Sequence, residues 1–127
     1  MRRVFLVCGS INALLAVALG AFGAHGLQHI ASSESIQTWH TAAQYQFYHA
    51  LALLIIAMLL ADYPKAKLAG QLMLAGIVLF SGSLYVLVLS QIKILGAITP
   101  VGGVCFLLGW LWLVKVFWQS KTLTNSA

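Results

Sequence analysis

The chain has 127 residues, of which 61% are hydrophobic and 7% charged, and its mean hydropathy is +0.95. A soluble domain carries about 25% charged residues, so seven basic and two acidic side chains are too few to cover a water-facing surface. The apolar composition also excludes an intrinsically disordered chain. The net charge of +5 comes from scattered Lys and Arg without a basic patch, so we expect no nucleic-acid partner. The composition predicts an integral membrane protein whose surroundings are the lipid bilayer.

The charged residues leave four charge-free windows, at residues 4–33, 35–61, 68–92 and 94–114. Each window can hold the roughly 20 apolar residues that cross a hydrocarbon core about 30 Å thick. Because a bilayer offers no water to unpaired backbone groups, the spans should be helices. The sequence therefore predicts an all-α membrane protein, a four-transmembrane-helix bundle. Its spans are expected at 4–24, 41–61, 68–90 and 100–118, within one membrane domain over residues 1–127.

The first span carries small residues at steps of four and three, which places them on one narrow face of a helix. In lipid, small residues let helix backbones approach closely. We expect a neighbouring helix to pack on this face, and glycines of the fourth span to serve the same purpose. The residues predicted to pack helices are Gly9, Ala13, Ala16, Gly20, Gly23, Gly102, Gly103 and Gly109.

The connection between the first two spans, residues 25–40, has two interpretations. Ser32–Ser35 is a plausible helix start, and the apolar residues Ile36 and Trp39 stand among polar ones. The pattern fits a short amphipathic helix lying on the membrane surface. It equally fits an ordinary loop that Trp39 anchors at the headgroups.

The distribution of Lys and Arg predicts the orientation of the chain. With the amino terminus inside, the inner side carries six basic residues and the outer side carries Lys93 alone. We therefore expect both termini in the cytoplasm (N-in/C-in) and the protein in the cytoplasmic, or inner, membrane. The six inner residues are Arg2, Arg3, Lys65, Lys67, Lys115 and Lys121.

Several polar side chains lie within the predicted spans, where lipid disfavours them. Such residues usually face the interior of a bundle and often mark a functional site. Most of them map to the outer half of the protein, which favours a polar cavity that opens outward and binds a small molecule, an ion or a lipid headgroup. The alternative is that they only form interhelical hydrogen bonds, each worth about 0.6 kcal/mol on average. The residues predicted to line the cavity are His25, Tyr45, Gln46, His49, Ser81, Ser83 and Tyr85.

The sequence contains no catalytic motif. Glu34 and Asp62 fall on opposite sides of the membrane, and Ser81 lacks the Gly-x-Ser-x-Gly frame of a nucleophile elbow. We therefore expect a protein that is not an enzyme, and we assign no cofactor and no metal site.

Two other functions stay open. The outer-side histidines suggest a metal- or haem-binding redox protein. His25 and His29 share a helical face, and His25 and His49 could ligate a haem axially. His25 lies about 200° around the helix from Gly23, however, which turns it away from the helix on the small-residue face. The third hypothesis is a scaffold subunit of a larger membrane complex, and we also expect self-association.

Four ordered motifs carry a resemblance to a known family. They are Gly20-Ala21-Phe22-Gly23-Ala24-His25, Tyr45-Gln46-Phe47-Tyr48-His49, Leu79-Phe80-Ser81-Gly82-Ser83-Leu84-Tyr85, and Thr99-Pro100-Val101-Gly102-Gly103 with Gly109-Trp110. Over essentially its whole length the chain resembles the small bacterial inner-membrane proteins of the domain of unknown function 423 family, which has a similar eukaryotic transmembrane relative. The resemblance implies a four-span protein of the cytoplasmic membrane and implies no activity.

Overall fold

The structure, a computed structural model, describes residues 1–120 and consists of helices and their connections over that range. Four helices are long and apolar enough to cross a membrane: Arg2–His29, Ser33–Leu59, Pro64–Ser90 and Lys93–Trp118. The α-helical parts are α1 (Arg2–His25), α2 (Ser33–Leu59), α3 (Lys67–Gly76), α4 (Ser83–Ser90) and α5 (Thr99–Trp118). Shorter 3-10 turns are η1 (Leu27–His29), η2 (Pro64–Ala66) and η4 (Lys93–Ala97), and the π-helical segment η3 (Ile77–Gly82) joins α3 to α4. The predicted class, an all-α four-helix membrane bundle, is confirmed.

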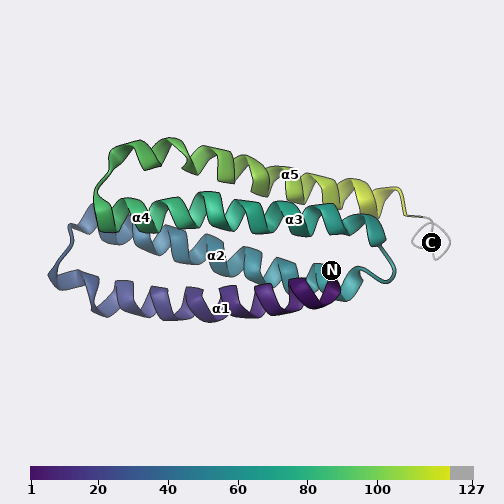
Figure 1. The fold of residues 1–127 in the computed structure, drawn as a ribbon, viewed down its shortest axis with the longest axis horizontal. Helices are drawn as coiled ribbons and strands as arrows, with labels where there is room; N and C mark the ends of the chain where they lie inside the picture. Colours follow the sequence, from purple (N-terminus) through teal and green to yellow (C-terminus); the bar gives the residue numbers. More distant parts are fainter. Residues whose placement is uncertain (121–127) are drawn as a thin grey trace.

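The four membrane helices lie side by side, with α1 and α5 on opposite sides of the molecule (Figure 1). α1 packs on α2, and α5 packs on α3 and η3. The inner two membrane helices are therefore more buried, at 50% and 39% of their most apolar stretch, than the outer two at 17% each. The first residues of α1, the α2–α3 connection and the last residues of α5 share one end (Figure 1). Five basic residues of the described chain are at that end, whereas Lys121 lies outside the described residues.

The second membrane helix begins earlier in the chain than the sequence suggested. The Ser32 hydroxyl accepts a hydrogen bond from the Ser35 backbone N–H at 3.1 Å, which caps the helix, and α2 then continues without a break to Leu59. The structure thus differs from both interpretations of residues 25–40, since there is no separate surface helix and Trp39 is not at the headgroups. Trp39 is only 2% exposed, because its ring packs with Leu27 and Val88 inside the bundle.

Two apolar clusters fill the bundle, one towards each end. The larger contains Phe5, Leu53, Met73 and Phe106 among its members, and the smaller is built on Leu27, Trp39 and Val88. Along α2, residues 42–49 separate the two clusters, and they include the buried polar side chains Gln46 and His49. The middle of the bundle is therefore a polar layer between two apolar ones.

The small residues of α1 face α2. A methyl group added at Gly9 would lie 3.0 Å from the Ala50 carbonyl oxygen, and one at Gly20 would lie 3.8 Å from the Ala43 Cβ. Gly23 lies directly under the Trp39 indole, where a side chain would overlap the ring. The closest approaches of α1 and α2 thus occur where α1 has no side chain.

The glycines of α5 differ from one another in their surroundings. A methyl group at Gly102 would lie 2.6 Å from the Leu79 carbonyl carbon and 2.8 Å from the Phe80 Cα, so the backbones of α5 and η3 nearly touch there. At Gly109 the nearest atoms belong to the flexible Met73 side chain, at 3.1 Å. Gly103 would meet only the Phe80 ring, at 3.8 Å. Gly102 is therefore the position where α5 tolerates no side chain.

This contrast predicts different effects for two neighbouring substitutions. Gly102→Ala should destabilise the protein by about 1–3 kcal/mol, since backbone must move to admit the methyl group. Gly103→Ala should be neutral or stabilise slightly, because alanine favours helix over glycine by up to about 1 kcal/mol. Thermal unfolding of both variants in detergent measures the difference, and equal Tm values would contradict the close approach at Gly102.

Candidate functional site

The centre of the polar layer is the side chain of Gln46, which is 5% exposed and equally far from the two ends of α2. Its Nε2 donates to the Asn12 Oδ1 at 3.0 Å, and its Oε1 accepts from the Tyr85 hydroxyl at 2.7 Å. Asn12 in turn donates from Nδ2 to the Cys8 carbonyl oxygen at 2.8 Å. These bonds link α1, α2 and α4 through side chains whose amide orientations the network itself fixes.

The two predicted serines make hydrogen bonds close to η3. Ser81 is 1% exposed and donates to the Ala42 carbonyl oxygen of α2 at 2.8 Å. Ser83 donates to the Phe80 carbonyl oxygen at 2.9 Å, so its oxygen accepts from the Thr99 hydroxyl, 2.6 Å away. Both hydroxyls hold η3 and its neighbours in place, and neither bonds to a histidine.

His49 is three residues after Gln46 on α2, about 60° around the helix, and contacts α5. The Trp110 indole N–H donates to its Nε2 at 3.1 Å, and an indole nitrogen can only donate. The His49 Nδ1 therefore carries the ring proton and donates to the Tyr45 carbonyl oxygen at 2.6 Å. The imidazole also stacks on Phe106, with ring centroids 3.5 Å apart and planes inclined by 10°. A neutral His49 thus has both ring nitrogens satisfied within the protein.

A groove of about 620 Å³ opens sideways between α2 and α5 beside His49. Aromatic rings form most of its wall, and no charged residue lines it. Tyr45 and Tyr48 are 40% and 53% exposed there, and their hydroxyls have no hydrogen-bond partner among residues 1–120. The lining residues are Tyr45, Tyr48, His49, Phe80, Pro100, Gly103, Val104, Phe106, Leu107 and Trp110.

The structure divides the seven residues expected to line one outward cavity. Gln46 and Tyr85 belong to the polar layer, the two serines bond around η3, and Tyr45 and His49 line the sideways groove. Gln46 is at the midpoint of α2, whereas Ser83 and Tyr85 lie nearer the Ser90 end of their membrane helix.

His25 lies apart from all of them. It is exposed at the end of α1, whereas Gly9 of the same helix lies beside Ala50, the residue after His49. Sixteen residues separate Gly9 from His25, which is about 24 Å along a helix at 1.5 Å per residue. His25 and His49 therefore do not share a site, and this pair cannot ligate one haem in this fold.

The other outer histidines give no metal site in the described chain. His25 is exposed at the end of α1, and His29 is exposed at the end of η1. His40 lies in the first third of α2. Within residues 1–120, no three His, Cys, Asp or Glu side chains come close enough together to hold a metal ion. The redox hypothesis thus finds no ligand set in this part of the chain.

Three contributors to the site were not among the predicted residues. Asn12 is a polar residue inside a span, so lipid physics alone singles it out. Trp110 stands near the centre of the predicted fourth span, a depth at which an indole N–H needs a protein acceptor. Phe106 carries no such signal, since it is an apolar residue among apolar neighbours. The first two could have been found from the sequence and the third could not.

The polar layer predicts that one tyrosine hydroxyl stabilises the fold and another does not. Tyr85→Phe leaves the Gln46 Oε1 without its donor and should lower stability by about 0.6 kcal/mol, and by no more than about 2 kcal/mol. Tyr48→Phe removes a hydroxyl that has no partner in the described chain and is the matched control, for which we expect no loss of stability. Unfolding of both variants in detergent, with a double-mutant cycle of Tyr85→Phe and Gln46→Leu, measures the coupling. Additive effects in the cycle would show that the two side chains do not interact.

Comparison with known proteins agrees with this architecture. Residues 19–103 match the family model described as protein of unknown function (DUF423). The chain is 56% identical over 115 residues to the UPF0382 membrane protein YwdK of Bacillus subtilis (strain 168), which covers 88% of this chain and 94% of that protein. It is 51% identical over 113 residues to a UPF0382 membrane protein of Staphylococcus aureus (strain bovine RF122 / ET3-1), and the match covers 88% of this chain and 93% of that protein. No solved structure is significantly similar to it. The chain therefore belongs to the DUF423 family and is a multipass membrane protein.

Proposed function

We propose that this protein binds a membrane-soluble molecule in the groove between α2 and α5 and catalyses no reaction. The molecule has a flat ring and one or two carbonyl acceptors. The protein lies in the cytoplasmic membrane with both termini in the cytoplasm, as the distribution of basic residues predicts. The cavity expected from the sequence was outward-facing and polar, whereas the groove opens towards lipid.

The observation that carries the proposal is the pair of unpartnered hydroxyls on Tyr45 and Tyr48. Tyr45 and Tyr48 lie within two residues of Gln46, the midpoint of α2. If the middle of this helix is at the middle of a hydrocarbon core about 30 Å thick, each hydroxyl is about 15 Å from either edge of that core. A hydroxyl without a hydrogen bond costs several kcal/mol in an apolar medium, and lipid tails provide no acceptor. A bound molecule that brings a carbonyl oxygen to this depth would remove that cost.

The shape and lining of the groove support a ring-bearing occupant. A volume of about 620 Å³ is within the range of small-molecule sites, which are mostly apolar with a few polar groups. Phe80, Phe106 and Trp110 line the groove and provide aromatic surface on which a planar molecule can stack. An ion is disfavoured because the groove has no charged side chain to replace its water.

The hydrogen bonds of the site support binding without catalysis. A hydrolytic site needs a nucleophile within reach of a base, but the Ser81 hydroxyl donates to the Ala42 carbonyl oxygen. His49, the histidine that lines the groove, makes hydrogen bonds to the Trp110 indole and to the Tyr45 backbone carbonyl. These groups hold the wall of the groove in shape, which is what a binding site requires.

The test uses two substitutions on successive turns of α5. Leu107 is 70% exposed and lines the groove, whereas Leu111 is 64% exposed and does not. Native mass spectrometry of the purified protein in detergent would count bound molecules of a decyl-substituted benzoquinone, with decylbenzene as the probe that lacks carbonyls. We expect one quinone per chain, retained in Leu111→Trp and lost in Leu107→Trp. The double variant Tyr45→Phe/Tyr48→Phe should bind about 5- to 30-fold more weakly, because a hydroxyl hydrogen bond contributes about 1 kcal/mol.

Three outcomes would overturn the proposal. Equal binding by the two tryptophan variants would place the probe outside the groove. Binding of decylbenzene as tight as that of the quinone would show that the tyrosine hydroxyls do not recognise the carbonyl groups. A dimer that Leu107→Trp dissociates would make the groove a contact between two copies of the chain.

A further inference from the structure

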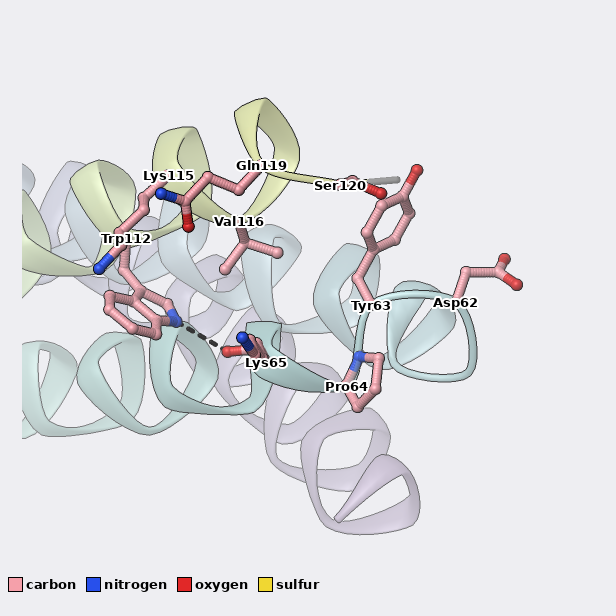
Figure 2. A pocket seen from close by; sticks show the side chains of 9 residues that line it. All are labelled: Asp62, Tyr63, Pro64, Lys65, Trp112, Lys115, Val116, Gln119 and Ser120. Carbon is pink, nitrogen blue, oxygen red and sulfur yellow. Dashed lines mark hydrogen bonds between the residues drawn. The ribbon is translucent and has the colours of Figure 1, made fainter. Parts of the chain in front are cut away.

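We propose a second binding site, independent of the groove, for the phosphate group of an anionic phospholipid. It is a pocket of about 360 Å³ where η2 meets the last turns of α5. Figure 2 shows the pocket, with Lys65 and Tyr63 contributed by the α2–α3 connection and Trp112, Lys115 and Gln119 by α5 and the residue after it.

Two contacts build this pocket. The Trp112 indole N–H donates to the Lys65 carbonyl oxygen at 2.7 Å, which joins α5 to η2 (Figure 2). The Lys115 Nζ lies 5.0 Å from the centroid of the Trp112 ring, within the range of a cation–π contact. The indole therefore contacts Lys115 through its ring and the backbone of Lys65 through its N–H. The side chains of both lysines line the same hollow, one on either side of the Trp112 ring (Figure 2).

The charge in the pocket is positive and unpaired. Neither lysine makes an ion pair with any residue of the described chain, and the one acidic residue at the rim, Asp62, directs its carboxylate away from both of them (Figure 2). Gln119 adds an amide, and the Tyr63 and Trp112 rings and Val116 add apolar wall. Two ammonium groups beside an apolar wall match a phosphate that is attached to a glycerol and its acyl chains.

The position of the pocket favours a lipid over a soluble anion. The third and fourth membrane helices run over Pro64–Ser90 and Lys93–Trp118, so the pocket is at the shared end of both spans, at the level of headgroups. Arg2, Arg3 and Lys67 are at the same end of the molecule. Basic side chains at a membrane surface attract anionic lipids, and this end carries almost all of those in the described chain.

Phosphatidylglycerol and phosphatidylcholine, added to the purified protein in detergent, distinguish charge from lipid bulk. Native mass spectrometry should show one phosphatidylglycerol retained per chain. In Lys65→Gln/Lys115→Gln its affinity should fall about 30-fold, because each lysine near an anionic lipid contributes about fivefold. Lys67→Gln is the matched control, since Lys67 is exposed at the same end but does not line the pocket, and we expect less than about a twofold change.

The outcomes separate this site from its alternatives. An equal loss in Lys67→Gln, or equal retention of phosphatidylcholine, would overturn the proposal in favour of general surface charge or of lipid bulk. Inorganic phosphate that binds the wild type as tightly as phosphatidylglycerol would assign the pocket to a free anion instead. The Tm of each variant in phosphatidylcholine checks folding, and Trp112→Phe, which keeps both lysines but loses the bond to Lys65, should also weaken binding. Leu107→Trp should leave this affinity unchanged, which keeps the test separate from that of the groove.

Discussion

The amide of Gln46 fixes how three membrane helices stand against one another. In the hydrocarbon core no water can satisfy an amide at the middle of a helix, so Gln46 must find partners in the protein, and it finds Asn12 on α1 and Tyr85 on α4. Apolar packing alone specifies height poorly, because lipid tails are as apolar as the leucines they replace. Asn12 and Tyr85 each occupy one fixed position along the axis of their own helix. Their meeting at Gln46 therefore sets the register of α1 and α4 on α2, with an apolar cluster above and below.

The groove follows from that register. With Gln46 turned towards α1 and α4, the adjoining face of α2 presents His49 and the rings of Tyr45 and Tyr48 to the groove beside α5. At Gly102 the backbone of α5 comes close to η3, while beside α2 it is held at a distance by aromatic rings. The space between them is the groove. Its existence thus depends on a glycine at one contact of α5 and on rings at the other.

The fold class could be predicted from the sequence because the number and apolarity of the spans need only composition and spacing. The site could be predicted only in part. Periodicity shows that Tyr45 and His49 share a face of one helix, and Ser81 and Tyr85 a face of another, but it does not show how two helices are rotated against each other. Gln46 adjoins Tyr45 in sequence yet points to α4, so one predicted set became a polar layer and a separate groove. The π-helical segment η3 changes the direction in which side chains after Ile77 point around the helix axis, and no pattern in the sequence predicts this segment.

Trp110 and Trp112 show why residue type alone misassigns such a protein. Trp112 lies towards the end of its span, where a tryptophan is expected to anchor the helix at the headgroups. It donates its indole N–H to a specific protein acceptor instead, as does Trp110 nearer the centre of the span. They are two residues apart, about 200° around the helix, so α5 is bonded on one side to His49 of α2 and on the other to the backbone of Lys65. α5 is among the least buried of the membrane helices, and apolar contact alone would leave it free to rotate in lipid. Two directional bonds from opposite faces remove that freedom, and they do so at the walls of the two sites proposed above.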